Sequence, residues 1–350
     1  MIANSMQIAA EDPEQVHAGT REVFFPVSLY ALSQEHLLTL VCHIYGVGIV
    51  LCLCPYIGNL VIALHAFEIE RLCQLIEKYK ATWQHIVPPV ALALATSPVV
   101  SKYDLSSLEV LSCAAAPLKK DLQERLMARL PRSRILQMYG MTEASPVTHL
   151  QRIADHGFTG TVGTLVPNME ARIVDDNTGK DLGINETGEL LVRGPNVMMG
   201  YVGDLNNIGV LSSDGWYSSG DIAYIDKNGL CYVVDRKKEL IKYKGFQVPP
   251  AELEGLLLTH PKVLDAAVCA YYCPEEATEV PLAYVVLAEE DRNQQTCKEI
   301  QRWADKRVAG YKQLRGGVHL IDAVPRNPSG KILRRMLPIQ IQGGKNASKM

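Results

Sequence analysis

The chain has 350 residues, of which 47% are hydrophobic, and its formal net charge at pH 7 is −3. This length favours two domains over one and allows a substantial core, while the small net charge excludes a general electrostatic attraction to nucleic acid. The nine cysteines show no paired CxxC spacing, which favours free thiols in a reducing compartment over a disulfide framework or a zinc site. Residues 1–15 contain neither a basic nor an apolar stretch, so we expect no secretory signal.

An apolar segment at residues 37–54 raises the question of a membrane span, since His43 is its only strongly polar residue. The segment also contains Gly46 and Gly48, ends before Pro55 and lacks flanking basic residues. These features favour a buried core helix, and we expect no transmembrane span.

After this segment, helical and strand patterns alternate, which is typical of a layered α/β domain. Apolar residues at helical spacing predict a helix over 66–80. We further predict a helix over 118–130 and strands within 82–89, 108–117 and 133–140. From about Gly160 the sequence changes to short β-rich stretches separated by Gly and Asp. These predict antiparallel strands within 171–183, 187–195 and 221–235, with turns such as 226–229.

The pattern changes again after Asp235. A cation-rich run ends at Gly245, and Pro249 and Pro250 then precede a predicted helix. Two strands, within 263–272 and 282–288, and a helix over 298–308 complete a small α+β unit. We therefore expect domains at 1–235 and 236–340, followed by a tail at 341–350.

Two motifs of the first domain carry candidate nucleotide-binding side chains. Residues 137–143 read QMYGMTE, where a strand ends in a glycine turn, so Thr142 could face a phosphate and Glu143 a Mg²⁺ ion. An incidental Thr-Glu pair at a strand end is the alternative. Residues 214–221 read DGWYSSGD, where Asp221 could accept both hydroxyls of a ribose or simply cap a turn.

Two further motifs are cationic. Residues 235–254 read DRKKELIKYKGFQVPPAELE, where Arg236 offers a planar donor fork and the later lysines could face an anionic ligand. A solvated charged face is the alternative. Residues 325–335 read PRNPSGKILRR, a Pro- and Gly-rich loop that projects Lys331. A lysine held in this way can neutralise charge that develops on a carboxylate and an α-phosphate, although alone the motif would pass for a surface tail.

In this order, YGMTE, TGEL, DGWYSSGD, DRKKELIKYKGFQ and PRNPSGK resemble the adenylate-forming (AMP-binding) superfamily, most closely the 4-coumarate–CoA ligase group. The resemblance covers nearly the whole chain. It implies an α/β fold with a large N-terminal domain of layered α/β and β subdomains and a small, mobile α+β C-terminal domain, with Asp235 at the hinge. It also implies two steps, in which a carboxylate and ATP give an acyl-adenylate and pyrophosphate, and the CoA thiol then attacks the adenylate.

The resemblance also implies roles for individual residues. Thr142 and Glu143 would hold phosphate and Mg²⁺, with Gln137 on the adenine side and Tyr139 and Gly140 beside the nucleotide. Asp221 and Arg236 would bind the ribose, and Lys331 would assist adenylation. Lys242 and Gln247 would contact the adenylate, whereas Lys244 and Gly245 would contact CoA after domain rotation. The acyl pocket would be lined by His43, Tyr45, Ala115 and Leu150. Judged locally, His43 could equally be a satisfied core histidine.

The sequence departs from the family pattern in three places. The Ser/Thr/Gly-rich loop that grips the β- and γ-phosphates has no counterpart in residues 1–30, so we expect an N-terminally truncated large domain. Residues 21–46 match the family poorly. Met138 and Ala114 stand where close relatives have glycine, and Ser219 replaces a threonine. We therefore expect weak or no ATP-dependent adenylation and an exposed apolar face over 37–64.

The leading functional hypothesis is an AMP-forming ligase that joins an aromatic or medium-chain carboxylic acid to CoA, using ATP and Mg²⁺. The alternative is a catalytically impaired remnant that binds nucleotide, CoA or a partner protein. A third, an adenylation module of a peptide synthetase, is disfavoured because no carrier segment follows Lys331. The C-terminal residues Ser348, Lys349 and Met350 resemble a peroxisomal address, so we expect a peroxisomal or cytoplasmic location.

Overall fold

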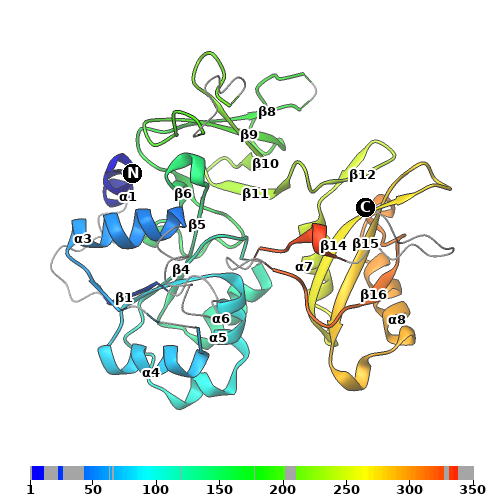
Figure 1. Ribbon diagram of the computed structural model, residues 1–350, viewed down its shortest axis with the longest axis horizontal. Coiled ribbons are helices and arrows are strands. Elements are labelled where there is room, and N and C mark those ends of the chain that lie inside the picture. Colours follow the sequence, from blue (N-terminus) through cyan, green and yellow to red (C-terminus); the bar gives the residue numbers. More distant parts are fainter. Residues whose placement is uncertain are drawn as a thin grey trace. The chain divides into compact units, whose positions relative to one another are not determined.

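The computed structural model describes residues 2–11, 23–26, 43–62, 64, 67–118, 120–176, 178–201, 210–326 and 331–337 (Figure 1). Within this part of the chain there are two compact units. The first holds residues 2–237 together with Lys331, and the second holds residues 238–326 and 332–337.

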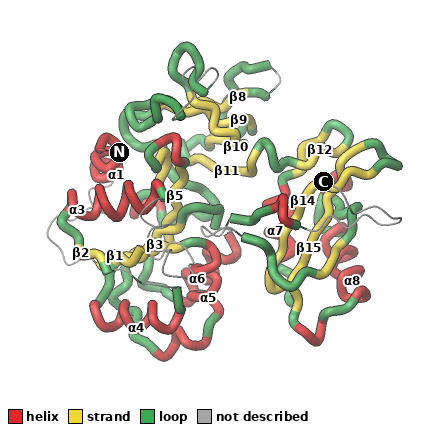
Figure 2. Tube along the Cα trace, viewed as in Figure 1, coloured by secondary structure: helices red, strands yellow, loops and turns green. Residues whose placement is uncertain are grey.

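The first unit contains a seven-stranded sheet with the order β2-β1-β3-β4-β5-β6-β7 (Figure 2). Strands β1 to β5 are parallel, whereas β6 and β7 run antiparallel to their neighbours. The parallel strands alternate with helices, as the α/β pattern predicts. The elements are β1 (Val23–Pro26), β2 (Leu60–Val61), α4 (Ile69–Tyr79), β3 (Trp83–Ile86), α5 (Pro88–Thr96), β4 (Val110–Cys113), α6 (Lys120–Arg129), β5 (Arg134–Gly140), β6 (Val147–Leu150) and β7 (Thr164–Leu165).

Both faces of this sheet pack against other elements. Leu111 and Ile135 belong to a core that they share with residues of α4, α5 and α6, whereas Val110 and Leu136 belong to a core on the opposite face. Because neighbouring strand residues point to opposite faces, β4 and β5 each contribute to both cores. This explains the continuous apolar runs that predicted buried strands.

A second sheet of the first unit is antiparallel throughout, with the order β11-β10-β9-β8. Leu190 and Ala223 from this sheet share a core with Leu136 from the seven-stranded sheet. The predicted antiparallel strands are thus confirmed, and the predicted turn closes with the Gly229 amide donating to the Asp226 carbonyl at 3.0 Å. The strands are β8 (Glu170–Val174), β9 (Gly188–Arg193), β10 (Tyr217–Ile225) and β11 (Cys231–Arg236).

The apolar segment near the N-terminus is helical where it is described. Gly46–Leu53 is a π-helical segment that continues into α3 (Cys54–Ile57), which ends at Gly58 with φ 77°. Ile49 is fully buried, whereas Leu51 is 49% exposed, so the helix buries one face only. Residues 37–42 lie outside the described part. No helix among the described residues is long and apolar enough to cross a membrane.

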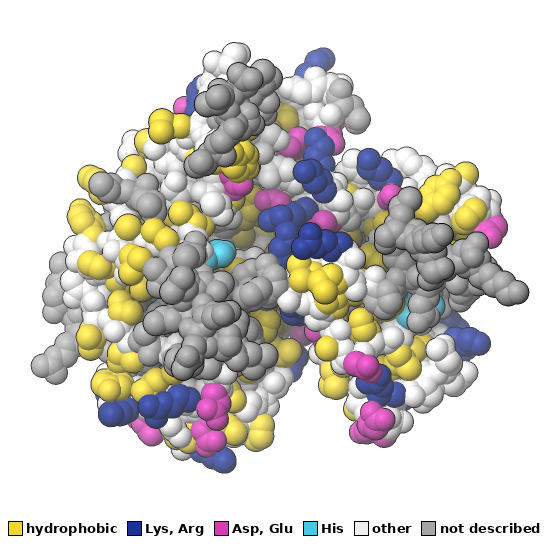
Figure 3. Space-filling view, in the orientation of Figure 1, with side chains coloured by type: hydrophobic (Ala, Val, Ile, Leu, Met, Phe, Trp, Pro, Cys, Tyr) yellow, Lys and Arg dark blue, Asp and Glu magenta, His cyan; other side chains and the backbone are white. Residues whose placement is uncertain are grey.

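Apolar side chains near this helix are exposed, as we expected for residues 37–64. Tyr56 of α3 is 62% exposed and Leu60 of β2 is 54% exposed. Met6, on α1 (Ile2–Glu11), is 54% exposed. Figure 3 shows apolar side chains at several places on the visible face of the first unit. The other side of α1 is anchored, because the Asn4 side chain donates to the Val147 carbonyl at 2.7 Å.

The second unit is a small α+β fold with a three-stranded sheet, β14-β15-β16, and a separate hairpin, β12-β13. Its core gathers apolar residues from the sheet and both helices, among them Leu253, Val268, Val285 and Ile300. Strand β15 begins at Thr278, four residues before the predicted strand. The elements are β12 (Ile241–Tyr243), β13 (Phe246–Val248), α7 (Pro250–Leu258), β14 (Val263–Cys273), β15 (Thr278–Leu287), α8 (Gln294–Asp305) and β16 (Val318–Leu320).

Candidate active site

The centre of the candidate site is the carboxylate of Asp221. The Tyr139 hydroxyl donates to Oδ2 of Asp221 at 2.5 Å, and Nε of Arg236 lies 3.4 Å from Oδ1. Tyr139 is near the end of β5, Asp221 is on β10 and Arg236 ends β11. The fold thus brings together three of the predicted nucleotide-binding residues, with Tyr139 82 positions from Asp221 and with Arg236 opposite Asp221 on the next strand.

An irregularity in β10 determines where the Asp221 side chain points. The pairing of β10 with β9 shifts register between Ser218 and Ile222, and Gly220 has φ 68°. Ser219 holds this bulge, since its hydroxyl donates to the Leu190 carbonyl at 2.6 Å and accepts from the Asp221 amide at 3.0 Å. A β-bulge redirects the side chains of its strand. The hydroxyl of Ser219 therefore has a structural role, which is to hold this bulge.

Tyr139 is held as a neutral hydrogen-bond donor. Burial, and then the negative charge of Asp221, raise the pKa of Tyr139 well above its ordinary value. Its ring also lies beside that of His149, with ring centroids 5.9 Å apart. Asp221 itself is only 6% exposed, so its oxygen atoms are largely fixed before any ligand binds. An acceptor held in this way is suited to the paired hydroxyls of a sugar.

The turn after β5 carries the predicted phosphate and metal ligands. Gly140 must be glycine, because a Cβ atom there would lie 1.9 Å from the Pro146 carbonyl oxygen. Thr142 and Glu143 then start a short 3₁₀ turn, Thr142–Ala144. Thr142 is exposed, and Oε1 of Glu143 accepts from the Tyr201 hydroxyl at 2.8 Å. Tyr201 had no signal in the sequence.

Gln137 lies inside the protein. It is 3% exposed, its Oε1 accepts from the Leu118 amide at 2.9 Å, and its Nε2 donates to Gln123 at 3.3 Å. Its described side-chain contacts are therefore to protein groups, and its role beside adenine stays a prediction. Of the predicted pocket residues, Leu150 is fully buried on β6, and Ala115 is exposed just after β4 with φ 71°.

The predicted acyl-pocket residues His43 and Tyr45 begin the helical segment. The Tyr45 hydroxyl lies 2.6 Å from Nδ1 of His85, and it also donates to the sulfur of Met138 at 3.9 Å. Burial lowers the pKa of His85 to about 3, so this imidazole is neutral. His43 is half-buried, and burial lowers its pKa as well. His85 was not among the predicted site residues, since its only signal is a histidine inside the strand WQHI.

A second polar cluster adjoins the Asp221 strand. Buried Glu189 on β9 accepts from Lys237 at 2.8 Å and from the Ser218 hydroxyl, and Lys237 also pairs with Asp176. Burial raises the pKa of Glu189, but Lys237 and Ser218 outweigh that effect, so the pKa lies below its ordinary value. Glu189 lies in the TGEL motif, but no role was predicted for it from the sequence. The cluster fixes the chain just after Arg236.

The predicted CoA-facing residues lie on the β12-β13 hairpin of the second unit. Lys244 and Gly245 form its two-residue turn with φ 45° and 86°, the signs of a type I′ turn. The exposed Lys242 and Gln247 are paired across the hairpin. The Nζ atom of Lys244 lies 2.8 Å from Glu276, which raises the pKa of that lysine. These four residues thus form one surface.

Arg326 and Ile332 pair as an isolated antiparallel bridge, and Lys331 lies between them in the sequence, directly before Ile332. The side chain of Lys331 is half-buried. Residues 327–330, the tail at 338–350 and the expected peroxisomal address lie outside the described part.

Among the described residues, no group of three or more His, Cys, Asp or Glu side chains is arranged to hold a metal ion. Glu143, as a single carboxylate with the neighbouring Thr142 hydroxyl, fits a Mg²⁺ ion that keeps its waters and phosphate ligands.

Two protein families match the chain. Residues 30–202 match the AMP-binding enzyme family, and residues 252–331 match the AMP-binding enzyme C-terminal domain. Together these ranges make up more than half of the sequence.

Curated relatives cover most of the chain. The probable 4-coumarate–CoA ligase 1 of Dictyostelium discoideum is 44% identical over 299 residues, which is 84% of this chain and 53% of the relative. The 4-coumarate:CoA ligase 1 of Petunia hybrida is 42% identical over 324 residues, or 91% of this chain and 59% of the relative. The chain therefore spans somewhat more than half the length of these relatives.

Solved structures have the same fold. The ATP-bound RpMatB-BxBclM chimera B1 matches with a TM-score of 0.82 and 25% identity, over 96% of this chain and 62% of the other. The o-succinylbenzoate coenzyme A synthetase (MenE) of Bacillus subtilis, in complex with ATP and magnesium ion, matches with a TM-score of 0.75 and 26% identity, over 95% of this chain and 64% of the other. The layered α/β fold with a small α+β unit is that of these enzymes.

Proposed function

Because the chain belongs to the AMP-binding enzyme family, we propose that it serves as an AMP-forming acid–CoA ligase. Its substrates would be a carboxylic acid, ATP and CoA. The observation that carries this proposal is the buried Asp221 carboxylate, with Tyr139 on one oxygen and Arg236 near the other. Fixed acceptors beside an arginine suit a ribose 5′-phosphate, which combines paired hydroxyls with an anion.

The residues of this chain would act mainly by positioning and charge neutralisation. Asp221 would accept from the ribose hydroxyls, and Arg236 would bind a ribose or phosphate oxygen. Lys331 would place its ammonium against the charge that develops as the carboxylate attacks the α-phosphate and pyrophosphate leaves. Thr142 would hold a phosphate oxygen and Glu143 a Mg²⁺ ion, and the ion would neutralise phosphate charge when bound.

The second step would use the hairpin of the second unit. The CoA thiol would attack the acyl carbonyl carbon, the bond from that carbon to the adenylate oxygen would break, and AMP would leave with the electron pair. Lys244 and Gly245 would lie along CoA, with Lys242 and Gln247 toward the adenylate. The exposed turn and the ammonium of Lys244 support this assignment, since CoA carries phosphates.

We propose an aromatic or medium-chain acid as the substrate. The buried side chains of Leu150 and Met138, the Tyr45–His85 pair and the half-buried His43 supply an apolar wall with few polar groups, which suits such an acyl group. Met138, in the position of a glycine in close relatives, would reduce the pocket volume and favour smaller acids.

The proposal separates into two measurable half-reactions of the purified chain. The first is ATP–pyrophosphate exchange across a panel of aromatic and aliphatic acids. The second is thioester formation from a synthetic acyl-adenylate and CoA, which needs no pyrophosphate contacts. Lys331→Ala should abolish most exchange and spare thioester formation. Equal exchange in both proteins would refute the role of Lys331.

Nucleotide binding is tested separately by calorimetric titration with AMP. Asp221→Asn should weaken AMP binding about tenfold or more, since it weakens hydrogen bonds to a charged acceptor. The matched control is Asp181→Asn, an exposed carboxylate of the same unit that pairs with Arg172 at 2.7 Å. Unchanged AMP affinity in the Asp221 variant would refute the ribose site. AMP binding with neither half-reaction would favour the impaired remnant over the ligase.

A further inference from the structure

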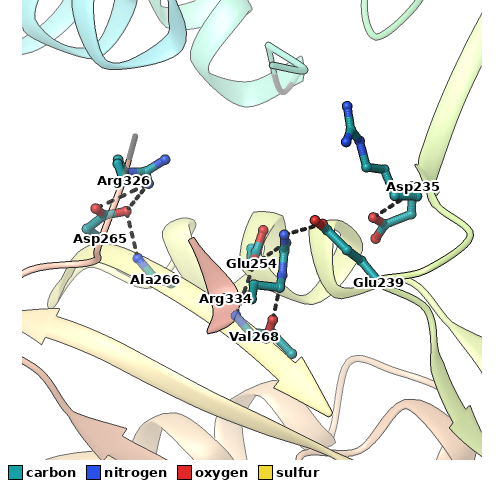
Figure 4. A network of polar contacts seen from close by, with 9 residues as sticks. Asp235, Glu239, Glu254, Asp265, Ala266, Val268, Arg326 and Arg334 are labelled. Atoms are coloured by element: carbon teal, nitrogen blue, oxygen red, sulfur yellow. Dashed lines mark hydrogen bonds and ion pairs between the residues drawn. The ribbon is translucent and has the colours of Figure 1, made fainter. Parts of the chain in front are cut away.

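The segment that follows Lys331 is tied to the second unit by a single guanidinium. Arg334 donates from Nε to the Val268 carbonyl at 2.9 Å and from Nη2 to Oε1 of Glu254 at 2.7 Å, and its Nη1 pairs with Glu239 (Figure 4). The side chain of Arg334 is 15% exposed and that of Glu254 only 6%. The three guanidinium nitrogen atoms of Arg334 therefore contact one carbonyl and two carboxylate groups in a largely buried site.

The hydrogen bonds of Arg334 are linked to one another, which restricts the side chain to a single position. Oε1 of Glu254 also accepts from the Val268 amide at 2.9 Å, so α7, β14 and the Arg334 fork form a closed set of contacts. A guanidinium is planar and presents its donors in a rigid fork, which a lysine ammonium cannot reproduce. A paired buried carboxylate also loses its compensation when the cation is removed. The position of Arg334 relative to β14 is thus tightly determined.

The residues before Lys331 are tied to the same strand. Nη2 of Arg326 lies 2.9 and 3.2 Å from the two oxygens of Asp265, and Oδ1 of Asp265 also accepts from the Ala266 amide at 2.9 Å (Figure 4). The bridge between Arg326 and Ile332 joins the two sides of the segment directly. Strand β14 therefore holds the chain on both sides of Lys331.

We propose that Arg334, supported by Arg326, is a positioning residue that sets the backbone of Lys331 for adenylate formation. This inference rests on the proposed ligase function. Lys331 lies only three residues from the Arg334 anchor, so a shift of the anchor moves the lysine backbone with it. A misplacement of about 1 Å far from the chemistry can cost about 100-fold in rate. Arg334 itself need not touch a substrate.

The test compares Arg334→Lys with wild type in both half-reactions. Arg334→Lys keeps the positive charge but loses the fork, and we expect kcat of ATP–pyrophosphate exchange to fall about 100-fold, the loss that a small misplacement produces. The KM for ATP and the rate of thioester formation from synthetic acyl-adenylate should change little. The matched control is Arg307→Gln, an exposed arginine of the same unit that bonds the Trp303 carbonyl, and it should leave both rates unchanged.

A double-mutant cycle separates positioning from general damage to the fold. If Arg334 acts through Lys331, Arg334→Lys should cause no further loss of exchange in the Lys331→Ala background. Losses that multiply in the double variant, or exchange by Arg334→Lys at the wild-type rate, would overturn the inference. If Arg334→Lys does not fold, Glu239→Gln weakens the same fork at its more exposed end and carries the same expectations. Absence of exchange in wild type would instead contradict the ligase proposal itself.

Discussion

The buried histidines should make the first unit sensitive to acid, and His149 allows the effect to be calculated. His149 is 1% exposed on β6, and its Nδ1 lies 3.0 Å from the Thr148 hydroxyl. Burial lowers the pKa of His149 from 6.5 to about 4. The unfolded chain therefore binds more protons between these values, so this contribution to stability is present above pH 6.5 and is lost as the pH falls toward 4. At about pH 5 the loss is about 2 kcal/mol.

The measurement is urea unfolding of wild type and His149→Gln at about pH 7.5 and pH 5, both in a Trp303→Phe background. Trp303 is the only tryptophan of the second unit, so the fluorescence then reports Trp83 and Trp216 of the first unit. The glutamine variant should be less stable than wild type near pH 7.5, because it loses packing, and should regain about 2 kcal/mol relative to wild type at pH 5. His85, whose pKa is lowered to about 3, is present in both proteins, so its contribution to the pH dependence of stability cancels when the two are compared. A stability difference that is independent of pH would refute the reasoning.

Three further outcomes follow from the site. Gly140→Ala should destabilise the first unit by about 3 kcal/mol or more, measured by the same urea unfolding, because the new methyl would lie 1.9 Å from a backbone oxygen. Tyr139→Phe should weaken AMP binding by calorimetry about tenfold and also lower the free energy of unfolding by about 1–3 kcal/mol, since it removes the donor that orients the buried Asp221 carboxylate. Lys244→Gly should raise the KM for CoA several-fold with little change in stability, because relief of about 1 kcal/mol of left-handed strain offsets the exposed ion pair with Glu276.

Local patterns predicted the elements that bury one clear face. The helix expected over 66–80 is confirmed as α4. It could be predicted because Leu72, Cys73 and Ile76 recur at helical spacing, lie on one side of the helix and are fully buried. The π-helical segment Gly46–Leu53 was predicted only as a core helix, since a run that is apolar on all sides carries no periodicity to reveal its hydrogen-bond pattern.

Strand β15 shows a second limit. The apolar run predicted this strand only from Leu282 onward, and Pro281 precedes that run. The structure begins the strand at Thr278 and tolerates the proline, since β16 pairs only with Ala283, Tyr284 and Val285 further along. Pro281 lies outside the part of β15 that pairs with β16, so its missing N–H removes no ladder hydrogen bond to β16.

The candidate site was predictable as a set of residues but not as an arrangement. Asp221 could be singled out from DGWYSSGD, yet its alternative role as a turn cap could not be weighed without its partners. Tyr139 reaches it from 82 positions away in the sequence. That contact depends on a core shared by two sheets and on a bulge fixed by the Ser219 hydroxyl, neither of which has a local signature.

The described contacts divide the proposed work between the two units. Tyr139, Asp221 and Arg236 make these contacts within the first unit, so the proposed ribose site uses residues of that unit alone. The proposed CoA-facing residue Lys244 is exposed on a two-residue turn, and the fork at Arg334 fixes the chain beside Lys331 rather than a ligand. Substitutions of Tyr139, Asp221 and Arg236 should therefore act mainly on nucleotide affinity, whereas substitutions of Lys331 and of its anchor Arg334 should act mainly on the rate of adenylate formation. Such a division is what differential stabilisation of a transition state requires, since only interactions gained after binding accelerate the chemistry.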